Sequence, residues 1–275
     1  MKISMVASSG MGYPLPEGSL GSGEMREVEG AFSRLAELGY NGVELSIEEP
    51  FRTESRRILE ISEQHGVEIP AIGTGLIYIR RRLSLSEPEE SKRMRTIKML
   101  TRTIEIAAYL NSLVIVGLVR GKIGSQRKRM AKFRRSMKEC DSVAEREGVQ
   151  LAIEPLNRYE ADSVNNVGEA LDLISDMDLQ STGLLLDTFH MNIEERSIED
   201  AIRRAGRRLI HMHIADSNRL SPGLGHIQFS NIIKVVAEQG YDRYLSAEII
   251  ALPSPIRAAR ITIRNLRELL EKRRV

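Results

Sequence analysis

The chain has 275 residues, a formal net charge of +2 and 41% hydrophobic residues, which is enough for one large core. This composition excludes intrinsic disorder, and the near-neutral balance does not predict a nucleic-acid partner. No apolar run approaches the about 18 residues of a membrane span, the first residues do not resemble a signal peptide, and Cys140 is the only cysteine. We therefore expect a cytoplasmic protein with no membrane partner.

Eight short apolar runs rich in β-forming residues recur along the chain and predict strands. Several of them are apolar throughout, as expected for parallel strands that are covered on both faces. In chain order the runs are Lys2–Ala7, Gly42–Ile47, Glu68–Gly73, Leu113–Gly117, Gln150–Glu154, Gly183–Asp187, Leu209–Ala215 and Tyr244–Ile250.

Amphipathic segments lie between these strands. Apolar residues recur at helical spacing in Met25–Leu38, Met94–Leu110, Met130–Glu147 and Ile232–Gln239. Glycines that predict helix ends follow three of the segments, at Gly39, Gly148 and Gly240. Basic runs at 127–135 and 203–208 fall in helical patterns beside acidic residues, so we interpret them as solvated helix faces rather than as a nucleic-acid-binding surface.

This order of strand, helix and strand predicts a single α/β domain, a (β/α)8 TIM barrel over residues 1–275 with about 34 residues per unit. A doubly wound open sheet is the alternative, but we do not recognise its glycine-rich phosphate-binding loop after the first strand. Active-site residues of such a barrel lie at the carboxyl ends of its strands.

The ends of the last four predicted strands carry side chains that bind metals. These residues are Glu154, Asp187, His213 and Glu248. Several unpaired charges in one dry cavity would each cost several kcal/mol, and a divalent cation removes that cost. Oxygen-rich ligands with one nitrogen suit Mn²⁺, Mg²⁺ or Co²⁺, and Zn²⁺ is also compatible. The alternative is four separate structural residues, each hydrogen-bonded in the core.

A metal bound to a ketone and the neighbouring hydroxyl would stabilise an enediolate. Glu154 and Glu248 come from predicted strands that are not neighbours, so they can face each other across a sugar. If one carboxylate removes a proton and the other returns one to the opposite face, the carbon is inverted, which is epimerisation. Proton movement between adjacent carbons would instead give aldose–ketose isomerisation.

Four segments resemble the ketose 3-epimerases, the D-tagatose and D-psicose 3-epimerase group of the xylose-isomerase-like TIM barrel superfamily. They are "IEPLNRYE" (153–160), "LLLDTFHMNIEE" (184–195), "HMHIADSNRLSPGLGH" (211–226) and "SAEI" (246–249). Two others, "AIGTGLIYI" (71–79) and "VIVGLVRG" (114–121), are more similar to the 5-keto-L-gluconate epimerase branch, which acts on a keto sugar acid.

The resemblance implies one divalent metal ion per chain, a sugar or sugar-acid substrate and a homodimer or homotetramer. It places the metal ligands on the four residues named above and the acid–base pair on Glu154 and Glu248. It places substrate-binding residues on Glu160, His190 and Arg219. From the residues alone, His190 could instead cap a following helix, and Arg219 could pair with Asp216.

The roles of four other polar residues remain open. Arg120 follows the fourth strand, where a guanidinium could hold a substrate carboxylate or form a surface ion pair. His211 is expected to support the metal site or to lie in the core. Glu44 could bind substrate or pair with a loop arginine, and His226 has no predicted role.

Other functions are compatible with this barrel. The apurinic endonucleases of the same superfamily bind three metals and need histidines after the third and fourth strands, where this chain has "IGTG" and "VGLVRG". A non-catalytic sugar-binding barrel would not need opposed carboxylates. The keto-sugar-acid epimerase is favoured over an epimerase of neutral ketoses such as tagatose, fructose or psicose, and over an aldose–ketose isomerase.

Overall fold

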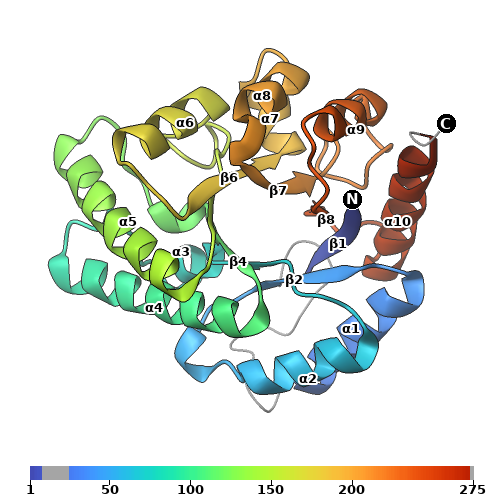
Figure 1. Cartoon of the computed structure of the whole chain (residues 1–275), viewed down its shortest axis with the longest axis horizontal. Coiled ribbons are helices and arrows are strands. Elements are labelled where there is room, and N and C mark those ends of the chain that lie inside the picture. Colours follow the sequence, from blue (N-terminus) through green and yellow to red (C-terminus); the bar gives the residue numbers. More distant parts are fainter. Residues whose placement is uncertain (8–24, 273–275) are drawn as a thin grey trace.

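The computed structural model describes residues 1–7 and 25–272. Within them, eight parallel strands form a closed barrel in which each strand pairs with the next and β8 pairs with β1 (Figure 1). The strands are β1 (Lys2–Ala7), β2 (Gly42–Ser46), β3 (Ala71–Gly73), β4 (Leu113–Val116), β5 (Leu151–Ile153), β6 (Thr182–Asp187), β7 (Leu209–Ile214) and β8 (Tyr244–Ala247). The predicted (β/α)8 barrel is confirmed, and closure excludes the open sheet. The segment after β1, where a phosphate-binding loop would lie, is outside the described residues.

Helices surround the barrel, with α10 beside α1 where the ring closes (Figure 1). The α-helices are α1 (Met25–Leu38), α2 (Ser55–His65), α3 (Gly75–Arg81), α4 (Glu90–Leu110), α5 (Arg127–Glu147), α6 (Val167–Asp176), α7 (Thr188–Glu194), α8 (Ile198–Ala205), α9 (Phe229–Glu238) and α10 (Pro255–Lys272). The 3-10 turns are η2 (Pro50–Arg52), η3 (Leu118–Arg120) and η4 (Gly206–Arg208). Within the described ranges no helix is both long and apolar enough to cross a membrane.

The predicted glycine stops are confirmed. Gly39, Gly148 and Gly240 follow α1, α5 and α9 with φ angles of 87°, 68° and 72°. These angles lie in the left-handed region, where a residue without a Cβ carries no steric penalty.

The main hydrophobic core lies between the strands and the surrounding helices, and a smaller apolar layer fills the barrel interior. Ala152 and Leu185 belong to this inner layer, and each lies two residues before a polar residue at the rim. Because side chains alternate along a strand, Glu154 and Asp187 point to the same interior side as these apolar residues.

Strand β7 carries a register irregularity against β6. Leu184 pairs with Leu209, whereas Leu185 pairs with His211, so Ile210 is an extra residue in β7. As a result Asp187 lies opposite His213, and the two residues meet at the carboxyl rim.

Candidate active site

The four residues predicted as metal ligands come together at the carboxyl rim of the barrel. Glu154 directly follows β5, Asp187 ends β6, His213 lies in β7 and Glu248 directly follows β8. One potential ligand atom from each residue lies within 4.8 Å of the others. Since β5, β6, β7 and β8 are consecutive in the barrel, strand pairing fixes this arrangement.

Several polar atoms of this cluster are buried without a hydrogen-bond partner. They are Oε1 of Glu154, Oδ2 of Asp187 and Nδ1 of His213. Nδ1 of His213 lies 3.6 Å from a carboxylate oxygen of Glu154 and 3.5 Å from one of Glu248. Buried polar atoms are normally hydrogen-bonded, so acceptor-rich atoms that converge without partners fit a divalent cation.

The carboxyl groups of the cluster differ in pKa. Burial, reinforced by the charge of Glu248, raises the pKa of Glu154. Burial likewise raises the pKa of Asp187, to about 6, although the nearby Arg219 opposes this shift. The pKa of Glu248 is lowered, because interactions with His213 and Arg219 outweigh its burial. Burial of Glu154 and the cationic neighbours of Glu248 thus separate the pKa values of the two acid–base candidates.

The three residues assigned to the substrate by resemblance also lie at this rim. The guanidinium of Arg219 donates to a carboxylate oxygen of Glu160 at 2.9 Å and to one of Glu248 at 2.8 Å. His190 faces the cluster, with Nε2 at 3.7 Å from Oδ2 of Asp187. The alternative in which Arg219 pairs with Asp216 through its side chain does not occur.

His190 does not cap a helix either. Asp187 is the N-cap of α7, and its side chain accepts a hydrogen bond from the backbone N–H of Phe189 at 2.7 Å. His190 lies inside α7, and its Nδ1 is 2.7 Å from the side-chain nitrogen of Asn157. The ring is thereby held with Nε2 toward the cavity.

A cavity of about 100 Å³ opens above these groups. Its polar side is lined by Glu44, Glu154, Glu160, His190, His213, Arg219 and Glu248. Residues of β2, α3 and the turn after β4 form the opposite wall, which includes Ser46, Thr74, Leu76, Ile79 and Leu118. A larger cavity of about 550 Å³ lies at the amino ends of the strands, but the unpartnered polar atoms of the cluster do not line it, so the smaller cavity is the candidate site.

The expectation that Arg120 holds a substrate carboxylate is corrected by its position. Arg120 is buried, and its guanidinium donates to the backbone carbonyls of Gly117 at 3.1 Å, Ser163 at 3.2 Å and Glu154 at 2.9 Å. Burial lowers its pKa to about 10. Arg120 is not among the residues that line the candidate cavity, and its guanidinium instead joins segments of backbone.

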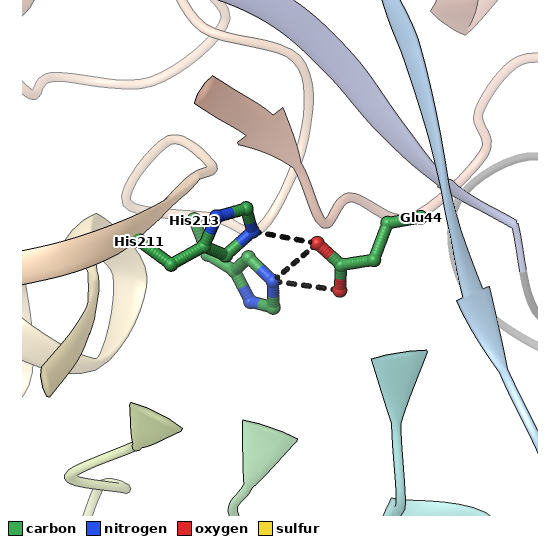
Figure 2. Close-up of side chains that lie close together, drawn as sticks. All are labelled: Glu44, His211 and His213. Atoms are coloured by element: carbon green, nitrogen blue, oxygen red, sulfur yellow. Dashed lines mark hydrogen bonds and ion pairs between the residues drawn. The ribbon is translucent and has the colours of Figure 1, made fainter. Parts of the chain in front are cut away.

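Glu44 is a residue whose role the sequence left open. It is buried in the barrel interior and faces the imidazoles of His211 and His213 (Figure 2). His211 lies in the barrel interior, and its contact in this group is with Glu44. His226, by contrast, is exposed in the loop after β7.

Comparison with known proteins agrees with this architecture. The family model described as "Xylose isomerase-like TIM barrel" matches residues 32–269, and the chain belongs to this family. Among curated relatives, L-ribulose 3-epimerase of Mesorhizobium japonicum is 27% identical over 82% of this chain and 77% of its own length. D-psicose 3-epimerase of Enterocloster bolteae is 41% identical, but the match covers only 39% of this chain and 36% of that protein.

Solved structures share the whole fold. An L-ribulose 3-epimerase structure superposes with a TM-score of 0.85 at 23% identity, covering 99% of this chain and 95% of the other. The 3-keto-D-glucoside 4-epimerase of E. coli superposes with a TM-score of 0.82 at 23% identity, covering 98% and 99% of the two chains. The fold is therefore shared with sugar epimerases, and the relatives matched by sequence are also named as sugar epimerases.

Proposed function

We propose that this chain is a metal-dependent sugar epimerase that inverts the carbon next to the ketone of a keto sugar. The observation that carries the proposal is the convergence of Glu154 and Glu248, from strands that are not neighbours, on Nδ1 of His213 beside one cavity. Glu154, Asp187, His213 and Glu248 would hold one divalent cation, with Mn²⁺ preferred and Mg²⁺, Co²⁺ or Zn²⁺ as alternatives. The bound cation would supply a Lewis acid for the ketone oxygen.

The remaining chemistry belongs to side chains of this chain. One glutamate removes the proton from the carbon beside the ketone, and the other returns a proton to the opposite face of the planar enediolate. The separated pKa values of Glu154 and Glu248 support this division into acid and base. Arg219 bridges Glu160 and Glu248, so it can orient one of the two carboxylates.

For the substrate we favour a keto sugar acid of the 5-keto-L-gluconate or D-tagaturonate type. The two segments that resemble the keto-sugar-acid branch, 71–79 and 114–121, provide the wall residues Thr74, Leu76, Ile79 and Leu118. Because Arg120 is engaged with backbone, Arg219 is the cation among the lining residues that could meet the carboxylate.

Neutral ketoses are the second candidate. Arg219 already contacts two carboxylates, Glu160 and Glu248, so an anionic substrate would have to compete with them. Tagatose, fructose and psicose should therefore be assayed with Mn²⁺ beside keto-hexonates. A clear preference for neutral ketoses would reject the keto-sugar-acid proposal while leaving the epimerase proposal intact.

The two-base mechanism is tested with Glu154→Gln and Glu248→Gln in deuterated water. Each change should stop inversion, while at least one variant should still exchange deuterium into the substrate, because a single base can remove and return a proton on its own face. Glu194→Gln is a matched control, since Glu194 pairs with Arg158 outside the cluster. Metal content must be measured in parallel, because both glutamates are also proposed ligands. If both variants keep substantial epimerase activity, the mechanism is wrong.

A further inference from the structure

Three side chains meet at a single carboxylate in the barrel interior. Nε2 of His211 lies 2.8 Å from Oε2 of Glu44, and Nε2 of His213 lies 2.9 Å from Oε1 (Figure 2). The hydroxyl of Ser246 donates to Oε2 of Glu44 at 2.8 Å. Glu44 comes from β2 and the other residues from β7 and β8, so these contacts cross the interior of the barrel.

The carboxylate of Glu44 determines which nitrogen of His213 carries a proton. Both oxygens of Glu44 face donor groups, as those of an ionised carboxylate do: Oε1 lies beside Nε2 of His213, and Oε2 lies beside Nε2 of His211 and the hydroxyl of Ser246. An ionised carboxylate only accepts hydrogen bonds, so the Nε2 atoms of both histidines must donate to it. Nε2 of His213 then carries its proton, and Nδ1, which faces Glu154 and Glu248, keeps a lone pair that can bind a cation.

We propose that Glu44 is a positioning residue for the cation site: it fixes the tautomer and ring orientation of His213, while His211 and Ser246 hold Glu44 in place. The inference rests on the proposed cation site. An imidazole binds a metal only through an unprotonated nitrogen, and a carboxylate on its other N–H also makes it a stronger ligand. Glu44 therefore acts on the cation through its contact with His213 and is not itself one of the four proposed ligands.

The same three residues could also be considered as a second metal site, because Glu44, His211 and His213 offer ligand atoms within 4.8 Å of one another. The contacts oppose this interpretation. Both oxygens of Glu44 already accept hydrogen bonds, so neither oxygen lacks a partner in this group. The unpartnered atoms lie on the other side of the His213 ring, at Nδ1.

The first test compares Mn²⁺ binding by the metal-free protein and by its Glu44→Met variant, following free Mn²⁺ by its electron paramagnetic resonance signal. The variant should bind Mn²⁺ about 10- to 100-fold more weakly, the usual effect of removing such a partner. Asp141→Asn is the matched control: Asp141 is also a buried carboxylate, and it accepts from Thr182 at 2.6 Å at the opposite end of β6. The control should lose stability but keep its Mn²⁺ affinity.

The second test reads the tautomer directly and does not depend on a folded variant. In the Zn²⁺-loaded, ¹⁵N-histidine-labelled protein, the proton of His213 should be on Nε2. A proton on Nδ1 would overturn the inference, as would an affinity of Glu44→Met within about threefold of the unchanged protein. Failure of the unchanged protein to bind Mn²⁺ would overturn the proposed cation site as well, and two tightly bound ions per chain would support a second metal site instead.

Discussion

Arg120 joins three stretches of backbone that approach one another beneath the candidate site. Its guanidinium donates to carbonyls in the turn after β4, directly after β5 and in the loop that follows β5. A buried cation with this many acceptors stabilises the backbone around it, and removing it leaves carbonyl groups without partners. Arg120 is therefore expected to stabilise the fold rather than to bind the carboxylate of a substrate.

We predict that Arg120→Met lowers the free energy of unfolding by about 2–4 kcal/mol and weakens turnover of keto-hexonates and neutral ketoses by the same factor. Denaturant unfolding and parallel assays of both substrate types measure these effects. Arg158→Met is the control, because the Arg158 side chain is largely exposed and pairs with Glu194 outside the cluster, so its loss should cost less than that of Arg120. A selective loss for keto-hexonates would restore Arg120 as a substrate-binding residue.

Gly117 leaves room for the side chain of Glu154. A Cβ added at this position would lie 2.5 Å from Oε2 of Glu154, so Gly117→Ala must displace the carboxylate. Because the displaced atom is the end of a flexible side chain, we expect the protein to fold while turnover falls by about 10- to 100-fold. Gly75→Ala is the matched control, since its nearest contact would be Leu118 at 4.0 Å. Equal activity of the two variants would show that Glu154 can shift without consequence.

Single residues differ in how well sequence could place them. The four proposed ligands were located correctly at the rim, because a parallel strand order brings strand ends together. The contact of Glu44 with His211 and His213 joins residues 167 and 169 positions apart, and no local pattern encodes it. Arg120 was misplaced because sequence locates a residue at a strand end but not the direction in which a turn sends its side chain.

At the scale of elements, the loop between β7 and α9 is organised by one carboxylate. Asp216 accepts backbone hydrogen bonds from Ser217 at 2.7 Å, Gly223 at 2.8 Å and Ile227 at 3.1 Å. Its backbone carbonyl also accepts from the N–H of Arg219, whose φ of 59° lies in the left-handed region. The loop therefore holds Arg219 in a conformation that a flexible segment would rarely adopt.

We predict that Asp216→Asn lowers the free energy of unfolding at neutral pH by about 1–3 kcal/mol, because an amide cannot accept all of these N–H groups. Burial raises the pKa of Asp216, but the N–H groups outweigh it and the pKa lies below its ordinary 3.8. Its stabilisation is thus present above that value and is lost as pH falls through the lower folded-state pKa. The stability difference between variant and parent should shrink in acid, and a pH-independent difference would contradict this account.

The elements themselves were predicted to different degrees. The start and end of α1 match the expected Met25–Leu38, and α4 and α5 begin four and three residues earlier than expected because polar first turns lack apolar periodicity. Helices α3 and α7 have seven residues each, too few for a helical period to be recognised. The register shift in β7 depends on its pairing with β6, which is a tertiary property.

At the scale of the whole molecule, the candidate site concentrates its proposed metal ligands on one half of the barrel. The proposed ligands lie in or directly after β5, β6, β7 and β8, and these strands run side by side. Without a cation, the carboxylates of Glu154 and Glu248 face each other and repel. The other strands do not bear ligands, so cation binding should stabilise the two halves of the barrel unequally.

We predict that Mn²⁺ at a hundred times its dissociation constant raises the free energy of unfolding by about 2.7 kcal/mol. In hydrogen exchange, amides at the carboxyl ends of β6, β7 and β8 should gain more protection than those of β3 and β4, because local opening of the first group releases the ion. Asp187→Ala should abolish both effects, since Asp187 supplies one of the unpartnered ligand atoms. Equal protection across all strands would mean that the ion acts on global unfolding alone. No protection would mean that the proposed ligands do not bind the metal.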